Sequence, residues 1–401
     1  MEKQKTVGFL LKRVDCHDGV ASHCETLIQG LRAVGWRVVL ITGSVHYDAA
    51  SVRRFEVLKG LVEDWLVFEE MRPLLPSVAG IRSIQKIVKK HEISLFHVHG
   101  YSMLFLARIL RMVTGLDCVA TFHPSLHSDD PTMLKEAVLR PKIRKYQIYL
   151  RTFAPKAFIA LSSDIERFLT QDLGFHRTKV RKILAGIDTR YFHPPSPEER
   201  QRVRQKLGLQ EEDLVCCLVG RLNWNKGHDI LIEAVRQTRK VVPGITLKCL
   251  FAGSGDQEKQ IKEYAFASDD DSHCFNFFGY VEDLREVYWT SDIFALPSRS
   301  EGFALVVAEA MCCGTVPIRT PGGGARDQIE QGKTGYIIPF DDPKALSEAI
   351  QRLANRDFRL QMGKRCLEYG SSVFAQELMV EKTVELYCEY ARMGTRESLK
   401  P

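Results

Sequence analysis

Short apolar runs alternate with amphipathic helical stretches along nearly the whole of this 401-residue chain. The first run is TVGFLL, which begins at Thr6. Runs of this length, separated by helical stretches, are typical of parallel strands joined by crossover helices, so the sequence predicts an α/β fold. The other runs expected to form strands are WRVVLIT, ISLFHVHG, DCVATFH and AFIAL in the first half and LVCCLVG, ITLKCLFAG, CFNFFG, DIFALPS, TVPIRT and TGYIIP in the second.

The alternation breaks near Ile183, where the chain reads ILAGIDTRYFHPPSPEERQRVRQKLGLQEED. The prolines and charges of this stretch indicate a linker followed by a short helix. A chain of 401 residues is also longer than one ordinary core, which favours two domains. We therefore expect two Rossmann-like, doubly wound domains, at 1–190 and 191–375. Ligands should bind in the cleft between them, at the carboxyl ends of the strands.

Composition narrows the class of protein. With 45% hydrophobic and 26% charged residues, the chain has the composition of a soluble globular protein. No apolar run is long enough to span a bilayer, and the N-terminal sequence MEKQKTVGFLLKRVD lacks the pattern of a secretory signal, so we expect a cytoplasmic protein. None of the 11 cysteines shows CxxC spacing and most fall in apolar segments, so we expect reduced core thiols.

Positive charge is concentrated in the first half of the chain. Residues 1–190 contain 29 Lys and Arg against 19 Asp and Glu, whereas the remainder contains 27 against 31. Seven of these cations lie in the amphipathic segment Lys135–Lys156. Such a segment can lie on an anionic membrane surface, which would make the protein peripheral on the inner face of the plasma membrane. A merely solvated basic face is the alternative, and nucleic-acid binding is not expected because no recognition motif accompanies the charge.

Two carboxylates mark the segment LPSRSEGFALVVAEAMCCGTVPIRTPGGG, at 296–324. Were Glu301 and Glu309 on one helix, they would lie about 12 Å apart along its axis and could not share one atom. A loop position for Glu301 fits better, with a helix that opens near Phe303 or Ala304. The two acids would then flank a helix N-terminus, which attracts phosphate. A nucleotide diphosphate-sugar would fit this arrangement, because it has hydroxyls at both ends and negative charge in the middle. The alternative is a solvated loop acid and a helix-surface acid.

Two cations follow the first predicted strand of the second half, in GRLNWNKGHDILIEAV. Arg221 and Lys226 should emerge at the carboxyl end of this strand, just before a helix that Lys226 or Gly227 opens. Two cations there could neutralise a diphosphate and stabilise the charge that appears on it as a leaving group. A pair of solvated cations is the alternative.

Single residues of the first half are weaker candidates. Gly19, at a strand-to-helix turn, would let the backbone approach a ligand, although a structural role is the commoner one. His123, just past a predicted strand, could bind a sugar hydroxyl or phosphate, or could be a satisfied structural histidine. His97 and His99 share one face of a strand, but no third ligand is evident, so we expect no metal site.

Four motifs, in order, carry a resemblance over nearly the whole chain: GIDTRYFHP, GRLNWNKG, SEGFALVVAEAM and GGGARDQIEQGKTGYIIP. Together they resemble the retaining family-four glycosyltransferases of GT-B fold. The resemblance implies two Rossmann-like domains that face each other across a cleft, with 1–190 on the acceptor side and 191–375 binding the nucleotide-sugar donor. It also implies a C-terminal helix, at about 376–401, that crosses back to the N-terminal domain.

The resemblance assigns roles to the donor-side residues. Arg221 and Lys226 would grip the donor diphosphate, and Glu301 would hold hydroxyls on the far side of the transferred sugar. Glu309 would hold the ribose hydroxyls. The segment that would meet the phosphates and the sugar comprises Gly302, Phe303, Ala304 and Leu305.

On the acceptor side, His123 resembles the cleft histidine of this family and Gly19 the glycine of its first loop. The chain departs from the family pattern at two positions. Asp18 precedes Gly19 where relatives often have a second glycine, which leaves the geometry of that loop open. Asp327 stands where a glutamate is usual after the GGG turn, which affects a local helix contact more than the chemistry.

The reaction implied is transfer of a hexosyl group from a nucleotide diphosphate-sugar to a hydroxyl of a glycan or lipid-linked glycan, with retention of anomeric configuration. UDP-hexose is favoured as the donor, with GDP-mannose as the alternative, and no metal or other cofactor is expected. The alternative functions are a phosphorylase or nucleotide-sugar epimerase on the same architecture, or a non-catalytic nucleotide-sugar-binding protein.

Overall fold

The computed structural model describes residues 5–14, 19–45, 49–67, 77–123, 144–145, 147–242, 244–267 and 273–391. Contacts between residues divide the chain into two units. The first unit extends to Gly186 and resumes at Gln376, and the second runs from Ile187 to Ala375. The boundary predicted from the sequence is residue 190.

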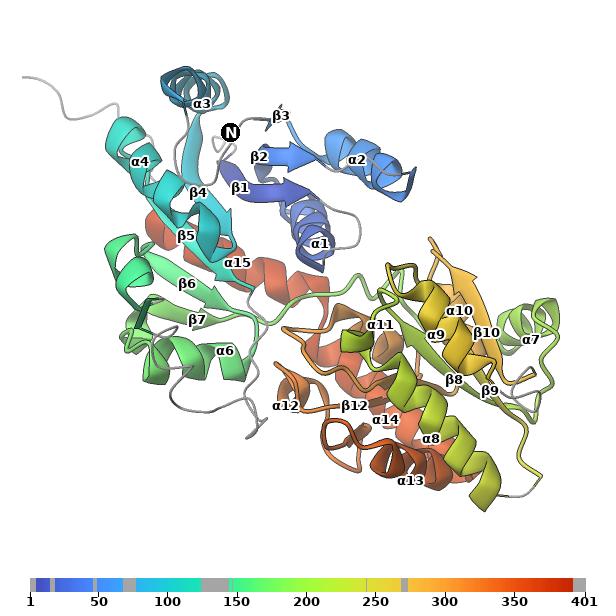
Figure 1. Ribbon diagram of the computed structural model, residues 1–401. Helices are drawn as coiled ribbons and strands as arrows, with labels where there is room; N and C mark the ends of the chain where they lie inside the picture. Colours follow the sequence, from blue (N-terminus) through green and yellow to red (C-terminus); the bar gives the residue numbers. More distant parts are fainter. Residues whose placement is uncertain are drawn as a thin grey trace, which may run out of the picture. The chain divides into compact units, whose positions relative to one another are not determined.

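The first unit is built on a seven-stranded sheet in which all neighbouring strands are parallel (Figure 1). The chain fills one side of β1 first and then crosses to the other side, so strand order reverses between β1 and β4. Ligands of such sheets bind outside the carboxyl ends of the strands at this reversal. In sheet order the strands are β3 (Asp64–Val67), β2 (Arg37–Val45), β1 (Thr6–Val14), β4 (Ile93–His99), β5 (Cys118–Phe122), β6 (Ala157–Ala160) and β7 (Val180–Lys182).

The last helix of the described chain belongs to this first unit, as predicted. α15 (Gln376–Tyr390), red in Figure 1, packs on α1 (Gly19–Ala33). A Cβ at Gly30 would lie 2.3 Å from Cγ2 of Val380, so only glycine allows the two helices to approach this closely. The other helices of the unit whose bounds lie within the described residues are α2 (Ala49–Leu61), α3 (Val78–His91), α4 (Leu104–Thr114) and α6 (Ser163–Arg167).

The second unit repeats the same design with six parallel strands. Its strand order reverses between β8 and β11. Apolar residues of the sheet and of the covering helices form one buried core, in which Leu231, Phe251 and Ile350 are fully inaccessible to solvent. In sheet order the strands are β10 (Phe275–Gly279), β9 (Leu247–Ala252), β8 (Leu214–Val219), β11 (Ile293–Leu296), β12 (Val316–Arg319) and β13 (Tyr336–Ile337).

Local signals fix where the helices of the second unit begin. At the start of α7, Ser196 and Glu199 form a reciprocal capping box around Pro197. α7 is the short helix predicted after the linker. Asp342 caps α13 in a similar way, by accepting from the Ala345 N–H. The helices are α7 (Pro197–Lys206), α8 (His228–Val241), α9 (Glu258–Ala265), α10 (Arg285–Thr290), α11 (Leu305–Cys312), α12 (Ala325–Gln328), α13 (Pro343–Ala354) and α14 (Arg356–Val373).

The predicted α/β fold with two parallel sheets is confirmed. Every apolar run named above forms a strand, and the sequence analysis missed only β3 and β7 among the described strands, which are short. Ten of the cysteines are described, and all are free thiols that are buried except Cys388. No helix in the described ranges is long and apolar enough to cross a membrane. Of the basic segment Lys135–Lys156, residues 144–145 and 147–156 are described, and the rest lies outside the described residues.

Candidate functional site

Lys226 and Glu301 form an ion pair at the carboxyl edge of the second sheet. Lys226 ends a short turn that follows β8, and Glu301 lies in the loop that follows β11. The Lys226 Nζ is 2.6 Å from Glu301 Oε1. The two residues meet because β8 and β11 are neighbouring parallel strands, whose carboxyl ends share one edge.

A glycine and an arginine hold these two loops together. Gly227 precedes α8 with φ +73°, and a Cβ there would lie 2.1 Å from the Pro297 carbonyl oxygen, so no other residue fits. The Arg299 N–H donates to the Asn225 carbonyl at 2.8 Å. The guanidinium of Arg299 also lies 2.6 Å from Asp229 of α8. The lysine turn and the glutamate loop are thereby fixed against one another.

The Glu301 carboxylate is buried and ionised. Burial raises the pKa of Glu301, but the charge and hydrogen bond of Lys226, the charge of Arg319 and a hydrogen bond from Ser298 outweigh burial and hold the pKa below its ordinary value. The Ser298 hydroxyl donates to the same carboxylate oxygen at 2.8 Å. Glu301 is therefore a fixed negative charge at neutral pH.

Arg221 adds an exposed positive charge at this edge. It follows the end of β8 and is exposed. Within the ranges that the structure describes, its guanidinium has no hydrogen-bond or ion-pair partner. Because Lys226 and Glu301 neutralise each other, the free guanidinium of Arg221 remains to bind an anion such as a phosphate.

The segment between Glu301 and α11 exposes the start of a helix. Ala304 is the N-cap residue and Leu305 the first helical residue, within one or two residues of the predicted opening. Gly302 and Phe303 are half-buried, and the Phe303 ring centre lies 5.9 Å from that of Phe374. The first N–H groups of a helix have no acceptor within it, which is the anion-binding feature that the sequence analysis predicted.

The fully buried guanidinium of Arg319 is linked to this segment through the side chain of Gln328. Arg319, the last residue of β12, donates to the Thr320 carbonyl at 3.2 Å, to the Gly323 carbonyl at 3.4 Å and to the side chain of Gln328. Gln328 in turn donates to the Ala304 carbonyl at 2.8 Å. Arg319 therefore fixes the residue at which α11 begins.

Glu309 lies inside α11 and is buried. The Tyr288 hydroxyl donates to Glu309 Oε2 at 2.8 Å. Burial, followed by the charge of Glu309, raises the pKa of Tyr288 well above its ordinary value, so the phenol keeps the proton that it donates. Tyr288 thus holds the Glu309 carboxylate in one orientation.

Sequence reasoning missed four residues that shape this edge. Arg319 left a signal, because an arginine interrupts the apolar strand run TVPIRT. The others left none, since a serine, a glutamine and a tyrosine at their positions are ordinary residues of a loop or helix. These three are Ser298, Gln328 and Tyr288.

The candidates of the first unit lie at the carboxyl edge of its own sheet. Gly19 is the first residue of α1 and is exposed, and a Cβ there would meet no atom of the described residues within 4 Å, so crowding by these residues does not require a glycine. His123 follows β5 directly and is half-buried. The structure places two further histidines beside it, one of which the sequence analysis did not consider.

These neighbours are His23 of α1 and His99, the last residue of β4. The three imidazoles each offer a ring nitrogen, and these nitrogens all lie within 4.8 Å of one another. His97 is not part of this group, because both of its ring nitrogens are hydrogen-bonded, to Tyr387 at 2.6 Å and to Thr121 at 2.7 Å. The expectation of no metal site considered only His97 and His99 as a pair, because strand periodicity does not show residues on other elements.

All four histidines are neutral at neutral pH. Burial lowers the pKa of His23 to about 4. Burial, with the charges of neighbouring imidazoles, lowers the pKa of His97, His99 and His123 well below 6.5. This edge therefore offers lone pairs and N–H donors, where the edge of the second unit offers charges.

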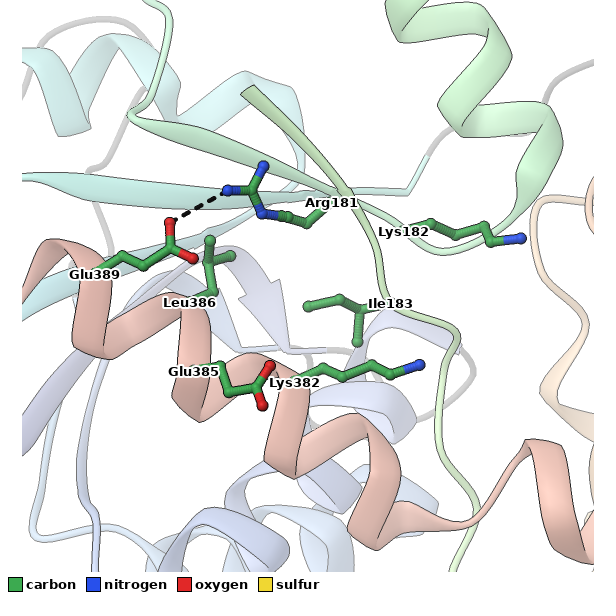
Figure 2. Close-up of a pocket in the computed structure, with 7 residues that line it drawn as sticks. All are labelled: Arg181, Lys182, Ile183, Lys382, Glu385, Leu386 and Glu389. Carbon is green, nitrogen blue, oxygen red and sulfur yellow. Dashed lines mark hydrogen bonds and ion pairs between the residues drawn. The ribbon is translucent and has the colours of Figure 1, made fainter. Parts of the chain in front are cut away.

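A separate pocket of the first unit lies between β7 and α15 and contains none of the predicted site residues. Figure 2 shows three cations and two carboxylates around it. Arg181 and Glu389 already form an ion pair there, at 3.3 Å. The pocket thus presents no single sign of charge to a ligand. Its lining residues are Arg181, Lys182, Ile183, Lys382, Glu385, Leu386 and Glu389.

Comparison with known proteins defines the class. Residues 17–191 match the family described as "Glycosyltransferase Family 4", and residues 199–371 match "Glycosyl transferases group 1". The D-inositol 3-phosphate glycosyltransferase of Corynebacterium kroppenstedtii is 33% identical over 387 residues, which cover 91% of this chain and 83% of that protein. The putative glycosyltransferase EpsD of Bacillus subtilis is 26% identical, over 80% of this chain and 83% of its own length.

Solved structures agree with this class at the level of the fold. Alr3699/HepE from Anabaena, in complex with UDP and glucose, superposes with a TM-score of 0.77 over 96% of this chain and all of that one, at 19% identity. The chain is thus a glycosyltransferase with two Rossmann-like domains. It belongs to the family-four glycosyltransferases of GT-B fold.

Proposed function

We propose that this protein is a retaining hexosyltransferase that uses a nucleotide diphosphate-sugar, with UDP-hexose favoured, and transfers the hexose to a hydroxyl of a glycan or lipid-linked glycan. The observation that carries this proposal is the Lys226–Glu301 ion pair at the carboxyl edge of the second sheet, where Arg221 follows β8 and its guanidinium has no partner among the described residues. It combines cations for a diphosphate with a fixed carboxylate for sugar hydroxyls at one edge of one sheet.

The charges of this edge suit departure of a nucleoside diphosphate. As the bond from the anomeric carbon to the phosphate oxygen breaks, negative charge grows on that oxygen, and Arg221 and Lys226 would stabilise it. The acceptor hydroxyl forms the new bond on the same face of the sugar and gives its proton to the departing phosphate oxygen. The products are the glycosylated acceptor and the nucleoside diphosphate.

Neither glutamate is suited to be a covalent nucleophile. Glu301 is held in its ion pair with Lys226 and accepts from Ser298. Glu309 is buried in α11, accepts from Tyr288 and is assigned to the ribose. A double-displacement scheme needs a free carboxylate at the anomeric carbon. Front-face substitution without a covalent intermediate is therefore the mechanism that we favour.

Proton NMR of the first product tests the stereochemistry. We expect the anomeric coupling constant of the donor sugar to persist in the product, before any mutarotation. An inverted coupling constant would contradict the proposed mechanism and leave the family membership intact.

A thermal-shift screen tests the donor. UDP is bound by HepE in its solved structure, which supports UDP here, whereas a mannosyltransferase of Corynebacterium glutamicum that is 30% identical over 53% of this chain is GDP-mannose-dependent. We expect UDP to raise the melting temperature more than GDP or ADP does, and a UDP-hexose to raise it further. A larger shift with GDP would assign the alternative donor, GDP-mannose.

We also infer that transfer needs no divalent ion, because Arg221 and Lys226 supply the positive charge that Mg²⁺ supplies to diphosphates elsewhere. The rate should be the same with and without a chelator such as EDTA. Loss of transfer in EDTA that added Mg²⁺ restores would contradict this inference.

A further inference from the structure

We propose that His23, His99 and His123 form a binding site for a transition-metal ion in the first unit, with Zn²⁺ as the expected occupant and one coordination position open. This proposal does not involve the charged groups of the second unit, but it gives His123 a different role from that of the cleft histidine that the family resemblance implies. It concerns a cluster whose members come from three elements, at the point where strand order reverses between β1 and β4.

The spacing of the three rings fits one tetrahedral ion. Zinc binds imidazole nitrogens at about 2.0–2.1 Å, so two such nitrogens stand about 3.4 Å apart and the centres of their rings roughly 5.2 Å apart. The ring centres lie 5.2 Å apart for His23 and His123, 5.6 Å for His99 and His123, and 5.8 Å for His23 and His99. His99 Nδ1 and His123 Nε2 are already 3.3 Å apart. Small rotations of the side chains would complete the site.

Two buried ring nitrogens of this cluster, His23 Nδ1 and His99 Nε2, have no hydrogen-bond partner among the described residues. Leaving a buried polar atom unpaired is costly, and native structures seldom do so. Because the His99 nitrogen near His123 is Nδ1, an ion bound there would leave His99 Nε2 unpaired, so of the two only His23 Nδ1 could gain a partner from the ion. A bound ion would fix the orientation and tautomer of each ring.

The surroundings close one side of the site and leave the other accessible. His97 stacks on His99 with ring centres 4.1 Å apart and is itself held by Tyr387 and Thr121. His123, in contrast, is half-exposed to solvent. Three protein ligands and an accessible fourth position are the coordination that zinc adopts where it binds a water or an exogenous ligand.

The ligand set selects the kind of metal. Imidazole nitrogens suit Zn²⁺, Cu²⁺ and Ni²⁺, whereas Mg²⁺ and Ca²⁺ require oxygen ligands. The site therefore cannot substitute for a Mg²⁺ that binds a diphosphate. Bound Zn²⁺ would instead tie the start of α1 to the carboxyl ends of β4 and β5, and so stabilise the first unit.

The test uses the full chain without an affinity tag, treated with a chelator and then freed of it. Zn²⁺ is titrated in competition with a chromophoric chelator. We expect one equivalent to bind per chain and to raise the melting temperature, while Mg²⁺ does neither. Co²⁺ should give the intense visible absorption of a tetrahedral complex. Absence of stoichiometric Zn²⁺ binding would overturn the proposal.

Single substitutions locate the ion. We expect His23→Asn, His99→Asn and His123→Asn each to weaken Zn²⁺ binding by at least about tenfold, since even loss of an outer partner of a metal ligand has an effect of this size. His176→Asn, at an exposed histidine of the same unit, is the matched control and should bind as the wild type does. Should His99→Asn fail to fold, the half-exposed His123 carries the test. Equal binding by His123→Asn and the wild type would overturn the proposal.

Discussion

The two units share one strand order but differ in the chemistry at the carboxyl edge of each sheet. In the first unit that edge carries neutral imidazoles, which are buried for His23 and His99 and half-buried for His123. In the second it carries the charged groups of Arg221, Lys226 and Glu301. The backbone design therefore determines where a site can form, and the residues that follow each strand determine what it can bind.

The largest effect is expected from a substitution at the charged edge of the second unit. Lys226→Ala removes a cation that we propose binds the diphosphate, and it leaves the Glu301 carboxylate buried without its ion-pair partner. We expect kcat/KM with the selected nucleotide-sugar to fall by about 10²–10³-fold, the effect of removing one preorganised donor from a developing anion. Lys259→Ala, at an exposed lysine of α9, is the control. Wild-type kcat/KM in Lys226→Ala would show that the diphosphate binds elsewhere.

A smaller effect should follow from the buried guanidinium behind the charged edge. Arg319→Met removes the donor to the Thr320 and Gly323 carbonyls and to Gln328. An unsatisfied buried acceptor costs about 1–3 kcal/mol, and we expect a loss of about 3 kcal/mol in the free energy of unfolding by urea. Arg365→Met, at an exposed arginine of α14, should change it by less than about 0.5 kcal/mol. Equal stability of the two variants would contradict a supporting role for Arg319.

The pH dependence of stability extends the comparison of the two units, because the second unit also contains a buried imidazole. Burial lowers the pKa of His228 to about 4. Between pH 6.5 and pH 4 the unfolded state thus binds a proton that the folded state does not, so stability falls as pH falls. At pH 5 His228 should cost about 2 kcal/mol relative to pH 7. His228→Asn should therefore show a shallower loss of stability from pH 7 to pH 5, measured by urea unfolding. An unchanged slope would contradict the lowered pKa.

The smallest effect concerns the carboxylate assigned to the ribose. Tyr288→Phe removes the hydroxyl that donates to Glu309 at 2.8 Å. A hydrogen bond to a charged group contributes about 1.5–3 kcal/mol, and part of it should appear as a rise in KM for the nucleotide-sugar of roughly tenfold with little change in kcat. Tyr264→Phe, at a partly exposed tyrosine of α9, is the control. A fall in kcat at unchanged KM would place Glu309 at the reacting centre instead.

Sequence reasoning predicted the features that depend on local pattern. Strand runs such as TVGFLL and LVCCLVG are apolar along their whole length because parallel strands are buried on both faces, and the structure confirms them. The loop position of Glu301 followed from helix geometry alone. In contrast, β7 has the sequence VRK, in which two of the three residues are charged, so it forms no apolar run that would predict a strand.

Features that depend on contacts between distant elements were not predictable. Nothing in the spacing of His23, His99 and His123 indicates that a helix and two strands bring them together. The same holds for Gln328, which reaches Ala304 across 24 positions of sequence. Polar contacts of this kind arise from sheet order, which a single sequence does not encode as a pattern.

Calorimetric titration with nucleoside diphosphates tests the central claim most directly, that the charged edge of the second unit holds the donor diphosphate. The wild type and the double variant Arg221→Ala, Lys226→Ala are each titrated with UDP, GDP and ADP. We expect one diphosphate to bind per wild-type chain, UDP most tightly, and binding to be lost in the double variant. Unchanged affinity in the double variant, or no binding of any of the three by the wild type, would contradict the account.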